Sequence, residues 1–60
     1  MELIRIKPEG RWWLVQFERG PHAQFPDRES ALSFATKSGR VGAVIEVLDA
    51  TGTLDIRITL

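Results

Sequence analysis

The side chains that could carry out chemistry are few and far apart in this chain. His22 is the only histidine and there is no cysteine. Imidazole and thiolate ligands therefore cannot form a metal cluster, and a Ser-His-Asp relay has one candidate base at most. His22 follows a Gly-Pro pair, a context typical of a solvated loop. We predict no catalytic residue, no metal site and no cofactor.

The acidic side chains that lie close in sequence have structural explanations. Asp27 precedes a helical pattern, where its carboxylate can accept the free N–H groups of a first turn. Glu29 would lie at the positive end of the same helix dipole. Asp49 begins a turn, and Asp55 lies on the polar side of an alternating strand. These positions predict caps and turns rather than acid–base catalysis.

A tryptophan near several cations offers a different kind of site. A flat ring on a sheet face with guanidinium groups beside it can stack single-stranded bases. The other interpretation is that two of these arginines, Arg5 and Arg57, pair with acids across strands, where each pair contributes little. The acids in question are Glu2, Glu46 and Asp55. The residues of the nucleic-acid alternative are Arg5, Arg11, Trp12 and Arg57, with Lys7 close by.

Length and charge restrict the class of protein. Sixty residues predict one domain over 1–60, of marginal stability, because a chain this short buries only about 60% of its unfolded surface. Eight basic and eight acidic side chains cancel, which disfavours binding driven by phosphate neutralisation. We see no signal peptide and no apolar run long enough to span a membrane, so we expect a cytoplasmic protein.

The pattern of apolar residues predicts two hairpins around one helix. Turns at 7–10 and 49–52 each end in glycine, which can close a short hairpin. The helix is expected from Arg28 to about Ser38, with Asp27 as its N-cap and Gly39 as its stop. The predicted strands are 2–7, 11–18, 41–48 and 53–60, with room for a short extra strand at 22–25.

This order predicts an α+β fold of the ββαββ type. The sheet would be antiparallel or mixed, with the single helix packed on one face. The core residues should come from the apolar side of each strand and from the helix. They are Ile4, Ile6, Trp13, Val15, Phe17, Phe34, Val41, Ala43, Ile45, Val47, Leu54, Ile56 and Ile58.

The opposite side of the predicted sheet is too apolar to be left to water. An uncovered cluster of this size is typical of an interaction site. Stems of Arg and Lys and the 19–26 loop could cover it, a second copy of the sheet could pack on it, or another molecule could bind it. The residues of this predicted partner-binding face are Leu3, Trp12, Leu14, Val44 and Leu48.

Three segments resemble a bacterial domain-of-unknown-function family of very small ββαββ proteins. Residues 10–15 are similar to its Gly-x-Trp-x-Val strand, and residues 25–35 to its Phe-x-Thr helix start, with Asp27 in place of Thr. Residues 49–54 are similar to its Asp-x-x-Gly hairpin. The resemblance implies a fold and no activity.

The sequence therefore predicts a non-enzymatic cytoplasmic domain. We expect a homodimer or a protein partner bound through the apolar sheet face, with no membrane and no small-molecule substrate. Nucleic-acid binding through Trp12 and the arginines is the alternative.

Overall fold

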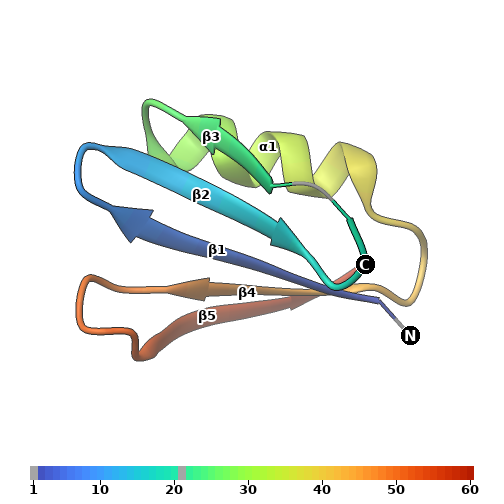
Figure 1. Ribbon diagram of the computed structural model, residues 1–60. Coiled ribbons are helices and arrows are strands. Elements are labelled where there is room, and N and C mark those ends of the chain that lie inside the picture. Colours follow the sequence, from blue (N-terminus) through green and yellow to red (C-terminus); the bar gives the residue numbers. More distant parts are fainter. Residues whose placement is uncertain (1, 21) are drawn as a thin grey trace.

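The computed structural model describes residues 2–20 and 22–60, which form one five-stranded sheet and one helix (Figure 1). The strands lie side by side in the order β3-β2-β1-β4-β5. The elements in chain order are β1 (Leu3–Glu9), β2 (Trp12–Phe17), β3 (His22–Phe25), α1 (Arg28–Ser38), β4 (Val44–Leu48) and β5 (Leu54–Thr59).

The sheet is mixed, and its one parallel pair is at the centre. β1 pairs with β2 and β2 with β3 in antiparallel fashion, and β4 pairs with β5 in the same way. β1 and β4 are parallel, because α1 carries the chain back across the sheet between β3 and β4. The α+β class, the mixed sheet and the extra strand at 22–25 are confirmed. The ββαββ order is wrong, since three strands precede the helix.

The first hairpin is tighter than the sequence indicates. β1 continues through Pro8 to Glu9, which pairs with Trp12, so the turn consists of Gly10 and Arg11. Gly10 has φ of 63°, a backbone angle that glycine adopts without steric cost. The parallel ladder between β1 and β4 ends at Ile6, so Pro8 lies where β1 has a partner on one side only. A proline is tolerated at such a position.

The second hairpin turn is stabilised by one carboxylate. Asp49 Oδ1 accepts hydrogen bonds from the Thr51 hydroxyl at 2.6 Å and from the N–H groups of Thr51 and Thr53 at 2.9 and 3.1 Å. These bonds, with the Thr51 hydroxyl first, lower the pKa of Asp49. The interpretation of Asp49 as a turn acceptor is confirmed.

The helix begins and ends as predicted, but for a different reason at its end. Asp27 Oδ1 accepts the Ser30 N–H at 2.7 Å, which confirms the N-cap, and this bond lowers the pKa of Asp27. Gly39 donates its N–H to Ala35 at 2.9 Å with φ of −75°, so it does not adopt the left-handed conformation. A Cβ there would collide with the side chain of Leu60 and crowd that of Ile4. The glycine thus leaves room for the side chains of Leu60 and Ile4 to pack against the end of the helix.

The core lies between α1 and one face of the sheet. Its fully buried side chains come from the two central strands, from β2 and from two alanines of the helix. The small alanines let the helix approach the sheet closely, and α1 lies against β1, β2 and β3. The buried residues are Ile4, Ile6, Val15, Ala31, Ala35, Ala43, Ile45 and Val47.

Four residues predicted to lie in the core are exposed. Val41 is 97% exposed because it lies in the turn before β4 and not in the strand. Phe34 packs its ring 5.0 Å from that of Phe25 but is 36% exposed at the rim of the core. Ile56 is 43% exposed, since β5 is the edge strand on the side away from β3. The fourth residue, Leu54, lies on the opposite face from the one predicted because of a β-bulge.

A β-bulge in β5 reverses the expected alternation at its start. Val47 pairs with Ile56 but Leu48 pairs with Leu54, so Asp55 is an extra residue. The bulge places Leu54 on the same face as Leu48, where it is 44% exposed. It also lets Asp55 pair with Arg28 of α1 at 2.8 Å, whereas the alternation predicts Asp55 on the polar face.

The fold predicts a large difference between two aliphatic truncations. Replacing the fully buried Ile45 by alanine should lower the free energy of unfolding by about 2–5 kcal/mol through lost burial and a cavity. The matched control, Val41→Ala, removes methyl groups from an exposed side chain and should change stability little. Urea denaturation followed by circular dichroism measures both. Equal losses would contradict the burial of Ile45.

Candidate interaction face

The face of the sheet opposite α1 carries every residue predicted to bind a partner. We call it the outer face. The register pairs Leu3 with Val44 and places Leu14 beside Lys7, while Ile4 and Ile6 point into the core. Leu3, Leu14, Val44 and Leu48 are half-buried. Trp12, the first residue of β2 and opposite Glu9, is 43% exposed.

A row of charged side chains crosses the middle of the outer face. Arg5, Glu46 and Arg57 lie opposite one another on β1, β4 and β5. Glu46 Oε2 accepts a hydrogen bond from Arg57 at 2.8 Å, and its Oε1 accepts one from Arg5 at 3.4 Å. The row confirms Glu46 as the cross-strand partner of both arginines, and it divides the apolar residues into two groups.

The two arginines hold Glu46 in its charged form. The hydrogen bond from Arg57 has the larger effect, and together with Arg5 it lowers the pKa of Glu46. The Glu46 side chain is 15% exposed, whereas those of Arg5 and Arg57 are 53% and 60% exposed. Since one carboxylate serves two guanidinium groups, the row has one net positive charge and unused donors that face solvent.

Two shallow hollows lie next to the row, both toward the end of the face where β1 begins. One, of about 520 Å³, is lined by Leu3, Val44, Glu46, Arg57 and Thr59 together with Glu2 and Glu18. The other, of about 310 Å³, lies against Leu3, Arg5, Gln16, Phe17, Glu18 and His22. Leu3 and Glu18 line both hollows, so the apolar side chain of Leu3 has charged residues in the lining on either side of it.

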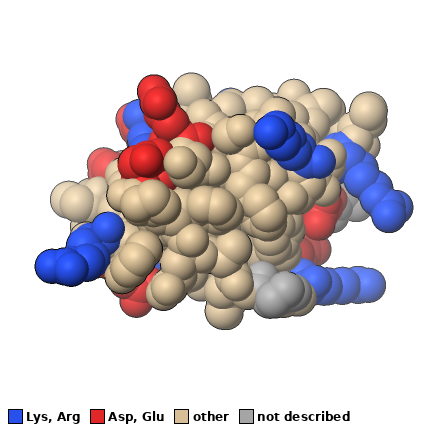
Figure 2. Space-filling model, turned by 90° about the horizontal axis from the view of Figure 1, so that it is seen from above, with Lys and Arg blue, Asp and Glu red and all other residues tan. Residues whose placement is uncertain are grey.

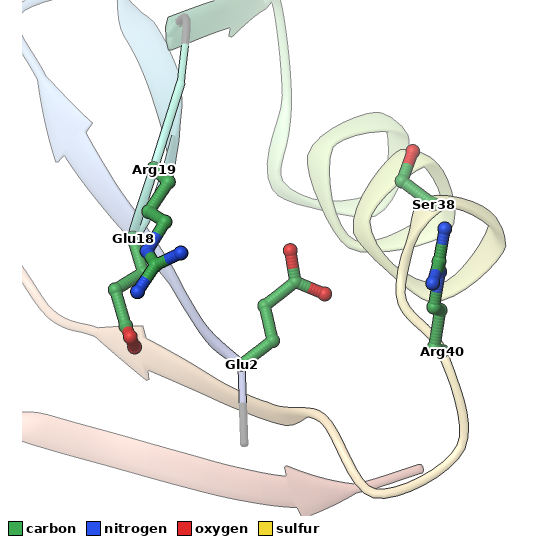
Figure 3. A pocket seen from close by; sticks show the side chains of 5 residues that line it. All are labelled: Glu2, Glu18, Arg19, Ser38 and Arg40. Carbon is green, nitrogen blue, oxygen red and sulfur yellow. The ribbon is translucent and has the colours of Figure 1, made fainter.

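A further open hollow of about 560 Å³ lies at one end of the molecule (Figure 3). Its lining residues are Glu2 before β1, Glu18 and Arg19 after β2, Ser38 at the end of α1 and Arg40 just after it. The Glu2 side chain extends between Arg19 and Arg40 (Figure 3). Arg19, Arg40, Glu18 and Ser38 all remain accessible to solvent, so no buried polar group preorganises this hollow for a ligand.

The remaining sequence candidates are dispersed over the structure. His22 is exposed on β3, and within residues 2–20 and 22–60 no group of three or more His, Asp or Glu side chains could hold a metal ion. Asp27 and Glu29 lie at the start of α1, and Asp49 lies in its own turn. Over the same described ranges no helix has both the length and the apolar character needed to cross a bilayer.

The residues of the nucleic-acid alternative are only partly assembled. Arg11 lies in the turn next to Trp12, whereas Arg5 and Arg57 belong to the charged row with Glu46. The charge available for a phosphate backbone is therefore smaller than the sequence indicates. Nucleic-acid binding stays a prediction.

Glu46, the centre of the charged row, is one of the three acids that the sequence offers as partners of Arg5 and Arg57, and the structure selects it. One further contact could not be located from sequence. The Arg28–Asp55 ion pair joins the helix to β5 and depends on the bulge, for which Thr53-Leu54-Asp55 carries no recognisable pattern.

A scan against protein-family models, a search of curated proteins and a search of solved structures give no match for this chain. The resemblance to a bacterial family of small ββαββ proteins therefore stays a prediction. The site has to be interpreted from its own geometry.

Acid should destabilise the protein in part through Glu46. Its pKa is lowered on folding, so it stabilises the folded state above about pH 4.3, the usual value for glutamate. That contribution is lost as the pH falls through the lowered value. The Glu46→Gln variant should be less stable at neutral pH, and its stability should fall less steeply with acid. Urea denaturation at a series of pH values, with Glu9→Gln as the control, measures this. An unchanged slope would contradict the role of the row.

Proposed function

We propose that this chain is a non-enzymatic interaction domain that binds a protein partner through the outer face. The single observation that supports this most is the exposure of Trp12 on a face that α1 leaves uncovered, next to half-buried leucines. Exposed tryptophan is enriched at binding hot spots, because its large ring loses much water-accessible area on contact.

The interior of the protein supports a binding role over a catalytic one. Over residues 2–20 and 22–60 every buried side chain is apolar, and no polar or charged side chain is buried. Catalytic groups act best when packing and hydrogen bonds hold them in a fixed, dry environment. The polar groups of the outer face are instead shared between neighbouring strands in an ion-pair row.

The charged row indicates the chemistry of the partner. Arg5 and Arg57 keep donors directed at solvent, and apolar side chains flank them on both sides. A partner with an apolar side chain between carboxylates would match both the guanidinium donors and the apolar side chains. A second copy centred on the same row would instead oppose two Arg-Glu-Arg rows of the same net charge. We therefore favour a different protein over face-to-face self-association.

Site-specific photo-cross-linking tests the proposal and identifies the partner in the same experiment. A benzophenone amino acid at position 12 would lie on the outer face, and one at Ser33 would lie on an exposed position of the helix. Irradiation in the source cells should yield an adduct with another protein at position 12 and little at position 33. Mass spectrometry identifies the adduct.

The other outcomes count against the proposal. Equal yields at both positions, or none at position 12, would overturn it. An adduct with a second copy of the chain would show self-association through the outer face in place of a different protein partner. An adduct with RNA or DNA would support the nucleic-acid alternative.

The salt dependence of binding distinguishes the nucleic-acid alternative from the proposed protein partner. If Trp12 and the arginines bound a single-stranded oligonucleotide, the affinity would fall steeply with salt, since each phosphate contact releases counterions. We expect no salt-sensitive binding when tryptophan fluorescence is titrated at two salt concentrations. Binding that weakens with salt and is lost in Arg11→Ala would contradict the proposed function.

A further inference from the structure

β5 is an edge strand that the rest of the fold leaves open. It has β4 on one side only, and Ile56 and Leu54 are 43% and 44% exposed on its two faces. Edge strands present unpaired backbone groups and are usually protected by shortness, by proline or by a covering element. β5 has six residues, contains no proline and lies on the far side of the sheet from β3, which α1 contacts.

The opposite edge is protected in two ways. β3 has four residues and is followed by Pro26, which cannot extend a ladder. α1 packs against it through Phe25 and Phe34, and the view down onto α1 and β3 shows charged side chains around an uncharged centre (Figure 2). The two edges therefore differ in how open their backbones are.

The hydrogen bonds of Leu60 show which groups of β5 face outward. Leu60 donates its N–H to Ala43 and accepts the N–H of Gly42, so its backbone points toward β4. Backbone direction alternates along a strand paired on one side. The backbone N–H and C=O groups of Ile58 and Ile56 therefore also point toward β4. Those of Arg57 and Thr59 point to the free edge.

We propose that β5 pairs with β5 of a second copy, antiparallel and centred on Ile58. Arg57 of each copy then exchanges both backbone hydrogen bonds with Thr59 of the other. Ile58 lies opposite its own equivalent, and Ile56 lies opposite Leu60. These apolar side chains are on the face that carries α1, where Ile56 is now exposed and Ile58 and Leu60 are half-buried. Cross-strand contacts of this kind stabilise antiparallel pairs.

The charges and the bulge of β5 disfavour two other registers. Centring the pair on Arg57 would place two arginines opposite each other, which is unfavourable. Centring it on Ile56 would place Arg57 opposite Asp55, but Asp55 is the extra residue of the bulge and its carboxylate binds Arg28. The Ile58 register avoids both the like charges and the bulge.

The pairing would join the outer faces of two copies into one surface. A two-fold axis perpendicular to the sheet keeps both helices on one side and both outer faces on the other. Each charged row would continue toward the row of the second copy through Arg57 and Thr59. The β5 contact lies at the edge of the sheet, whereas the proposed partner contact at Trp12 lies on the outer face near the other edge, so either proposal can fail alone.

Opposite charges at Thr59 test the register. Thr59 is exposed, so its replacement should leave the fold intact. Thr59→Glu would face Arg57 of the second copy and should tighten the dimer, whereas Thr59→Lys should weaken it, each by roughly two- to thirtyfold in Kd. Sedimentation over a wide concentration range measures this. Ser33→Glu and Ser33→Lys make the same charge changes on the helix and should have no effect.

A second measurement is independent of the variants. In the wild-type protein the amide protons of Arg57 and Thr59 should become protected from hydrogen exchange as concentration rises, while that of Gln24 on β3 should not. A monomer at every concentration even in Thr59→Glu would overturn the proposal. A dimer that tightens in Thr59→Lys would overturn this register, and one lost in Trp12→Ser but indifferent to Thr59 would move the contact to the outer face.

Discussion

The structure depends on the close approach of one helix to the centre of the sheet. Ala31 and Ala35 are fully buried, and their small side chains let α1 settle over the isoleucines and valines of the sheet. Gly39 continues this close packing past the end of the helix, beneath Leu60. An eleven-residue helix covers only part of one face, so the outer face and β5 must be stabilised by other means.

The outer face is stabilised by sharing charge between strands. Glu46 binds arginines from both neighbouring strands, which supports the register of β1, β4 and β5 on a face where apolar packing is incomplete. Both arginines are more than half exposed, so each pair adds modest stability. Their greater consequence is chemical, since they leave guanidinium donors among apolar side chains on the face that also carries Trp12. This combination of groups is the basis of the partner contact that we propose.

The two proposed contacts have the same origin, because α1 covers only part of the sheet. Within residues 2–20 and 22–60, Trp12 is open because the one helix packs on the opposite face of the sheet, and β5 is open because that helix lies toward the other edge. The elements that the structure describes therefore leave both the outer face and the β5 edge uncovered. Association is a common way for small domains to bury what their own core cannot.

Local sequence determined most of the elements, because the signals for them are local. Asp27 as a cap, the glycine turns, the helix bounds and the faces of Ile4, Ile6 and Trp13 follow from spacing and short-range hydrogen bonds. Only the tertiary structure decided the strand order, the parallel central pair and the bulge at Asp55, since these depend on contacts between distant segments. The exposure of Val41 and Ile56 was decided there too, because the fold places Val41 in a turn outside the strand and Ile56 on an edge strand that the helix does not cover.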